Sequence, residues 1–193
     1  MTARSMLLGV LMLLSVTAAR AQGNGPINIL GTVEKIDATS ISVKADDGGA
    51  VESFKLAPTW LAVQNKPATL ADIKPNDFVA SAAVRGADGK LHSTELRIFP
   101  DAMRGVGEGQ RPMNDARAQT MTNATVTGAA VVDGSNNIKV KFEGGESELI
   151  LDPGVPVTRI DVTDKSLVVT GAKVRVQGVR NADGATVTRV TIR

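Results

Sequence analysis

Residues 99–121 combine arginine, methionine and glycine in a stretch without helical or strand periodicity. The guanidinium groups of Arg104 and Arg111 could bind a carboxylate, a phosphate or an acidic sugar, because their planar fork matches such oxyanions. With Glu108 between them, these residues form the predicted contact region for a ligand or partner. The alternative is a local salt-bridge network between the arginines and the acidic residues of the same stretch, Asp101, Glu108 and Asp115.

Thioether and imidazole groups offer a different chemistry, the binding of a soft metal ion. Met103 and Met113, together with His92, form the alternative site for copper(I), because thioether sulfur suits that ion. The methionines of this stretch (103, 113 and 121) are far apart along the chain, whereas a compact methionine motif is closely spaced. We therefore favour flexible apolar side chains that pack the stretch onto a barrel, and we expect no metal and no cofactor.

His92 is the single histidine, and the chain has no cysteine. A serine-type triad would need His92 as its base, and a zinc site would need several further ligands. Alternation along the strand places His92 on the same face as Leu96 and Ile98. In the second sequence copy the equivalent residue is Thr186, which favours a structural role for His92. We expect a protein that is not an enzyme, with a hydrolase that depends on His92 as the catalytic alternative. Trp60, beside Leu61 and Val63, is expected in a core.

The first 21 residues resemble a cleaved signal peptide. Arg4 supplies the positive charge, residues 6–16 (MLLGVLMLLSV) are apolar, and Ala19 and Ala21 are the small residues before a cut between Ala21 and Gln22. Such a short apolar run does not span a bilayer, which needs about 20 residues. The expected location is therefore periplasmic or secreted, with no membrane span after the signal is removed.

The charge balance argues against nucleic acid as a partner. The whole chain has 22 Lys and Arg against 20 Asp and Glu. Arg4 and Arg20 leave with the signal peptide, and residues 1–21 contain no acidic residue, so the remaining net charge is zero. Nucleic-acid binding would require a basic stripe with interleaved aromatic residues.

Two similar sequence copies follow the leader. Residues 84–89 (VRGADG) resemble residues 179–184 (VRNADG), and Leu96-Arg97-Ile98 resembles Val190-Thr191-Ile192. This repeat predicts a first β-barrel domain at 22–98, a connector at 99–121 and a second β-barrel domain at 122–193.

Each copy has the alternation of β-strands. Apolar residues at Ile41 and Val43, at Ile138 and Val140, and at Val174 and Val176 alternate with polar ones, which predicts one face in a core and one in water. Asp-Gly pairs mark the turns between strands. A short helix is expected over Thr69–Ile73, with a related segment at 163–167. About five or six strands per copy favour an all-β protein of two tandem small OB-like barrels joined by an irregular connector.

The segments Gly31-Thr32-Val33, residues 70–79 (LADIKPNDFV) and Ala87-Asp88-Gly89 are similar to the bacterial exported domain-of-unknown-function family 5666. The resemblance covers the first copy well and the second more loosely. It implies a small exported β-barrel, and it brings no catalytic residue to transfer.

These observations favour a non-enzymatic periplasmic binding or interaction protein. The expected partner is an envelope protein or a glycan, held by a barrel face or by the connector residues Arg104, Glu108 and Arg111. A copper-handling protein is the alternative, and a hydrolase is the third hypothesis.

Overall fold

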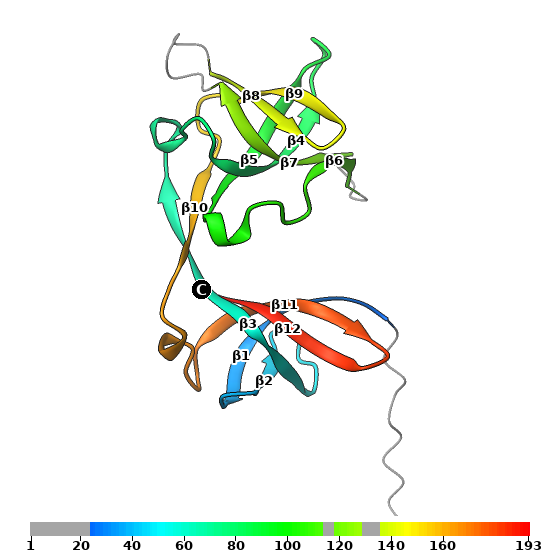
Figure 1. Ribbon diagram of the computed structural model, residues 1–193, viewed down its shortest axis with the longest axis vertical. Helices are drawn as coiled ribbons and strands as arrows, with labels where there is room; N and C mark the ends of the chain where they lie inside the picture. The colour runs from blue at the N-terminus through cyan, green and yellow to red at the C-terminus, as the bar shows by residue number, and fades with distance from the viewer. Residues whose placement is uncertain (1–23, 114–117, 129–135) are drawn as a thin grey trace, which may run out of the picture.

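The computed structural model describes residues 24–113, 118–128 and 136–193. The expected signal peptide at 1–21 and the part of the connector at 114–117 lie outside these ranges. The described chain is built from β-strands and short 3-10 turns, as the alternation predicts, and its strands form one continuous network of pairings. Two lobes joined by a narrow stalk are visible in Figure 1.

The first lobe, called the terminal barrel, closes from both ends of the chain. β1 pairs with β2 and β2 with β3, while β11 joins β1 to β12 and β12 returns to β3 in parallel. This circuit of five strands with one parallel closing pair is the OB-like barrel that the sequence predicts. Its strands are β1 (Gly25–Ile36), β2 (Ser40–Ala45), β3 (Val51–Ala68), β11 (Lys173–Asn181) and β12 (Gly184–Ile192).

The second lobe, called the inserted barrel, is built from the middle of the chain. β7 pairs with β8 and β8 with β9, while β4 joins β7 to β5. β5 meets β9 in parallel through only two residue pairs, Leu91 with Leu149 and His92 with Ile150. Its strands are β4 (Phe78–Arg85), β5 (Leu91–Phe99), β7 (Thr120–Gly128), β8 (Asn137–Phe142) and β9 (Gly145–Ile150).

The barrels therefore exchange strands between the two sequence copies. Each barrel takes three strands from one copy and two from the other. The expectation that residues 22–98 form one barrel and residues 122–193 the other is therefore wrong. The reason lies in β3, which runs for 18 residues without a turn. The chain has left the terminal barrel before the turn at residues 70–72, and it continues into the inserted barrel. The sequence similarity between the two copies did not reveal which strands pair with one another.

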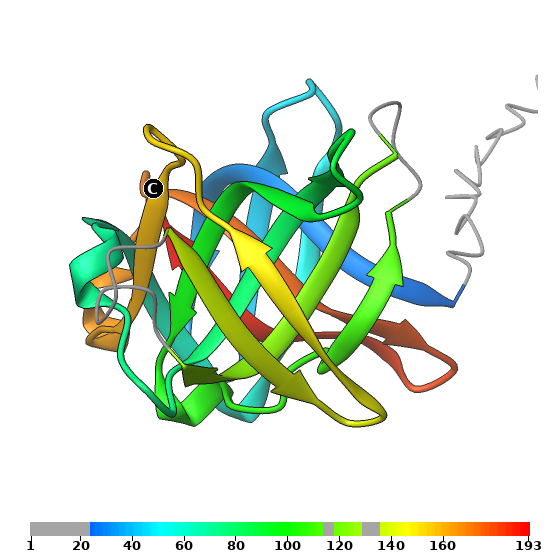
Figure 2. The same ribbon diagram turned by 90° about the horizontal axis from the view of Figure 1, so that it is seen from above.

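The stalk between the barrels consists of the second half of β3 and of β10 (Val157–Val162). The two segments pair antiparallel, with Asn65 opposite Ile160 near the middle of the ribbon. β10 also pairs in parallel with the end of β5, which fastens the stalk to the inserted barrel. Viewed from above in Figure 2, the inserted barrel lies over the terminal barrel.

Each barrel has its own apolar core. Val33, Val43 and Trp60 lie in the core of the terminal barrel, and Leu96, Val140 and Leu149 lie in that of the inserted barrel. The expected core position of Trp60 is confirmed, because 7% of it is exposed. A third, small cluster joins Met103 to Val63 and Ile160 of the stalk. It is the apolar contact between the connector and the stalk.

The expected short helices are 3-10 turns. η1 (Leu70–Asp72) is closed by the Asp72 carboxylate, which accepts a hydrogen bond from the Thr69 backbone N–H at 2.8 Å. In the second copy, η4 (Lys165–Leu167) is capped by Asp164, which accepts from the Ser166 N–H at 2.8 Å. Both turns end a strand that leaves one barrel.

Candidate anion-binding site

The connector is more ordered than the sequence suggests. It contains η2 (Asp101–Met103) and a short strand, β6 (Gly109–Pro112), which pairs with β7. Gly105, Gly107 and Gly109 all have positive φ angles, a conformation that glycine adopts without strain. These residues fold the connector back onto the inserted barrel.

The predicted contact residues of the connector hold it in place. Arg104 donates hydrogen bonds to the Asn76 carbonyl at 2.9 Å and to the Asp101 carboxylate at 2.7 Å. Arg111 donates to the Gly107 carbonyl at 2.7 Å, and Glu108 accepts from the Glu143 backbone N–H at 3.2 Å. These contacts do not bring the three side chains into one shared site. Their role in binding a partner stays a prediction.

The residues of the copper hypothesis lie in two different places. Met103 is buried in the cluster with Val63 and Ile160, as an apolar plug would be. It packs near Phe99, at the opposite end of β5 from His92, and seven residues of strand span roughly 23 Å. Among the described side chains, no three His, Cys, Asp or Glu residues converge where a metal ion could be held.

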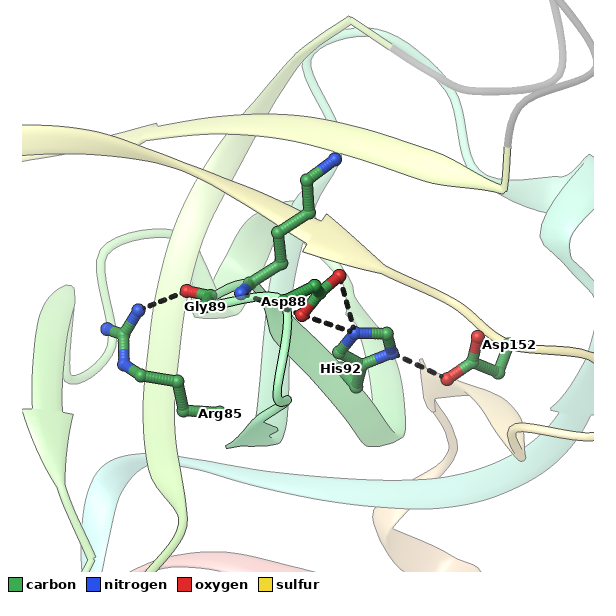
Figure 3. A network of polar contacts seen from close by, with 6 residues as sticks. Arg85, Asp88, Gly89, His92 and Asp152 are labelled. Carbon is green, nitrogen blue, oxygen red and sulfur yellow. Dashed lines mark hydrogen bonds and ion pairs between the residues drawn. The ribbon is translucent and has the colours of Figure 1, made fainter.

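His92 lies between two carboxylates (Figure 3). Its Nδ1 is 2.8 Å from Asp152, in the loop after β9, and its Nε2 is 3.2 Å from both carboxylate oxygens of Asp88, in the β4–β5 turn. Hydrogen bonds that the ring donates to the carboxylates of Asp152 and Asp88 raise the pKa of His92 above its usual 6.5. Because each ring nitrogen faces a carboxylate, His92 resembles an ionic clamp rather than a base beside a nucleophile.

The prediction that His92 lies on the same strand face as Leu96 and Ile98 is wrong. Leu91, Ser93, Leu96 and Ile98 are buried, whereas His92 is partly exposed. A register shift between Ala82 and Ala83 of β4 places an extra residue in β5, and such a bulge inverts the alternation beyond it. Simple counting from Leu96 crosses this bulge and therefore assigns His92 to the core side.

A cavity of about 240 Å³ lies at the junction of the two barrels and is lined by strands of both. We call it the junction cavity. No Asp or Glu is among its lining residues, whereas four arginines are: Arg97, Arg175, Arg189 and Arg193. The remaining lining residues are Leu30, Asn65, Phe99, Ile160, Gln177 and Thr191.

The strand alternation explains why these arginines face the cavity. Val174 and Val176 of β11 point into the core of the terminal barrel, so Arg175 points outward. Leu96 and Ile98 point into the core of the inserted barrel, so Arg97 points outward from β5. The outer faces of β11 and β5 both reach the junction cavity, because Arg175 and Arg97 line it together.

Arg189, on β12, is partly shielded from water. Its Nε and Nη2 donate to the Gln177 side-chain oxygen at 2.9 and 2.7 Å, and its Nη1 lies 3.5 Å from the Met103 sulfur. Burial lowers the pKa of Arg189, and the positive charges of Arg97 and Arg175 lower it further. The group remains protonated, since guanidinium is not deprotonated in proteins. Arg189 is thus a positive charge held among like charges.

Two of the four arginines have carboxylate partners outside the cavity lining. Arg97 lies 3.1 Å from Glu95, and Arg193 lies 2.7 Å from Asp46. The side chain of Arg175 makes no hydrogen bond or ion pair with the residues that the structure describes, and it also borders a neighbouring pocket lined by Asp46, Asp47 and Glu52. An anion in the cavity would offset the repulsion between these groups and accept their free N–H donors.

The sequence reasoning missed this site. The alternation of Lys173, Arg175 and Gln177 with buried valines was assigned to a strand face in water. That assignment is correct for an isolated barrel, but here the second barrel lies over the face. The sequence does show several arginines at outward-facing strand positions. It does not show which of these positions lie close together, because that depends on how the strands are shared between the barrels.

Comparison with protein-family models, with curated proteins and with solved structures gives no match to this chain. Across the described ranges, no helix is both long and apolar enough to cross a bilayer.

Proposed function

We propose that the protein is a non-enzymatic binding protein that holds an anionic group of its ligand in the junction cavity. The observation that carries this proposal is Arg189, a partly shielded guanidinium in a cavity that is lined by further arginines and by no Asp or Glu. An unpaired charge that is withdrawn from water destabilises a fold. Its retention is understandable if a ligand supplies the missing negative charge.

The surrounding geometry suits oxyanion binding. Gln177 fixes the orientation of the Arg189 fork before a ligand arrives, which lowers the ordering cost of binding. Thr191 and Asn65 add polar groups to the lining. Guanidinium groups bind carboxylates and phosphates through pairs of hydrogen bonds, and charged hydrogen bonds are about twice as strong as neutral ones.

A binding role agrees better with His92 than a hydrolytic one does. Both ring nitrogens face carboxylates, so neither is positioned to take a proton from a hydroxyl nucleophile. The proposal also retains the expected export to the bacterial periplasm, where the ligand would be an acidic small molecule, glycan or protein group.

Isothermal titration calorimetry with inorganic phosphate at low ionic strength tests the proposal, because salt screens charge interactions. We expect saturable binding to the wild type and an affinity loss on the order of tenfold or more in Arg189→Gln. Arg104→Gln is the matched control, since it also removes one arginine, but from the connector. Loss of binding in Arg104→Gln with none in Arg189→Gln would move the site to the connector.

A further inference from the structure

The four arginines of the junction cavity differ in whether they have an ion-pair partner. Arg97 and Arg193 each have a carboxylate within ion-pair distance, Glu95 and Asp46 respectively. Arg175 and Arg189 have none among the residues that the structure describes. Two guanidinium groups of the cavity therefore lack a carboxylate within ion-pair distance, although Arg175 also borders a neighbouring pocket lined by Asp46, Asp47 and Glu52.

These two groups lie close to each other on neighbouring strands. Arg175 stands opposite Thr191, and Arg189 stands opposite Gln177, in the antiparallel pair β11–β12. Arg175 and Arg189 are thus diagonal neighbours on the outer face of the sheet, a relationship that separates residues by about 7–8 Å. Their long side chains line the same cavity, so one small ligand group can contact both.

We propose that the group held in the junction cavity is a doubly charged oxyanion of the phosphate-monoester class. This proposal rests on the proposed function and narrows it. A phosphate monoester carries close to two negative charges at neutral pH and offers three acceptor oxygens. A monoanion would leave one of the two guanidinium groups uncompensated.

The arrangement also assigns different tasks to the two arginines. Arg189 is already fixed by Gln177 and has Met103 against its third nitrogen, so it provides a charge in a set orientation. Among the described residues the Arg175 side chain has no hydrogen-bond or ion-pair partner, so its guanidinium N–H groups can contact the ligand. Arg175 therefore recognises the second negative charge of the ligand.

Calorimetric titration with methyl phosphate and methyl sulfate tests the proposal, because the two ions have nearly the same shape and differ in charge. We expect the wild type near pH 7.5 to bind methyl phosphate on the order of tenfold more tightly than methyl sulfate. Below the second phosphate pKa, which is about 6, this preference should disappear, while methyl sulfate binding stays constant.

Arg175→Gln should bring the two affinities together near pH 7.5, whereas Arg104→Gln should leave the preference intact. Equal affinities in the wild type would overturn the dianion proposal and leave the proposed function standing. Absence of binding by both ions would overturn the proposed function as well. The pH comparison in the wild type needs no variant, so it remains informative if Arg175→Gln does not fold.

Discussion

Gln177 and Arg189 stand opposite each other on β11 and β12, and the side-chain oxygen of Gln177 accepts two hydrogen bonds from Arg189, at 2.9 and 2.7 Å. The pair is neutral on one side and cationic on the other, so it orients the arginine without compensating its charge. In an ordinary surface salt bridge the partner of the arginine would neutralise its charge, whereas Gln177 leaves the charge of Arg189 in place.

Arg189→Met should stabilise the ligand-free protein. The substitution keeps the apolar stem, removes a partly desolvated charge and relieves repulsion with Arg97 and Arg175. We expect the free energy of unfolding in urea to rise by about 1 kcal/mol, with loss of phosphate binding. Arg97→Met is the comparison and should stabilise less, because it relieves the same repulsion with Arg189 but also breaks the ion pair with Glu95. A clear loss of stability in Arg189→Met would contradict the account.

Gly178→Ala should disturb the site through the backbone. A Cβ at Gly178 would overlap the Thr186 carbonyl oxygen and lie 2.7 Å from the Val187 Cα, so β11 and β12 must move apart. Overpacking of this kind costs typically 1–3 kcal/mol. Because Gln177 precedes Gly178, phosphate affinity should fall too.

Gly128→Ala in β7 is the control for Gly178→Ala, since its Cβ meets its nearest neighbour at 3.8 Å. Chemical denaturation and phosphate titration of both variants provide the comparison. Equal effects of the two substitutions would mean that the backbone approach at Gly178 is unimportant.

The His92 clamp should make stability depend on pH. The pKa of His92 is raised by Asp152 and Asp88, so the charged form is favoured in the folded state. Its contribution is therefore fully present below the unfolded value of 6.5 and is lost as the pH rises through the folded pKa. His92→Gln should remove this dependence. Because the chain has one histidine and no cysteine, no other side chain has its usual pKa in this range.

Urea unfolding of the wild type and of His92→Gln between about pH 5.5 and 8.5 measures the His92 contribution. The stability difference between the two should shrink toward the alkaline end. Asp152→Asn removes the carboxylate that contributes most to the raised pKa of His92, so it should reduce the difference at the acid end. A difference that grows with pH would contradict the sign of the clamp.

The inserted barrel should fold as an isolated fragment. Residues 69–160 contain all of its strands and Val157 of its core in one continuous stretch. The terminal barrel depends on both chain ends, so a chain that stops after residue 160 should leave β1–β3 without their partners β11 and β12. We expect a cooperative thermal transition for fragment 69–160 and none for fragment 24–68. Failure of 69–160 to fold would favour independent repeats over exchanged barrels.

The local structure was accessible from the sequence because it depends on near neighbours. Alternation at Val174 and Val176 and the cap at Thr69 were interpreted correctly, as was the burial of Trp60. Strand exchange was not accessible, because the repeat supplies equivalent strands and either copy can satisfy the same hydrogen-bonding pattern. The choice follows from the continuous extension of β3 beyond Leu56, which no local residue preference specifies.

The site could not be predicted for the same reason. Arg97 is separated from Arg175 by 78 positions in the sequence, and the two meet only because the barrels face each other across the stalk. The connector arginines were more conspicuous, since they cluster along the chain. Arg104 and Arg111 are engaged by carbonyl groups of their surroundings, whereas Arg175 has no such partner in the described structure.

The most direct test of the central claim is a phosphate titration followed through the arginine Nε–Hε resonances by NMR in ¹⁵N-labelled protein. The account predicts saturable shifts for Arg175 and Arg189, with the connector arginines Arg104 and Arg111 unchanged. Shifts confined to the connector arginines, or no saturable shift at Arg175 and Arg189, would contradict anion binding in the junction cavity.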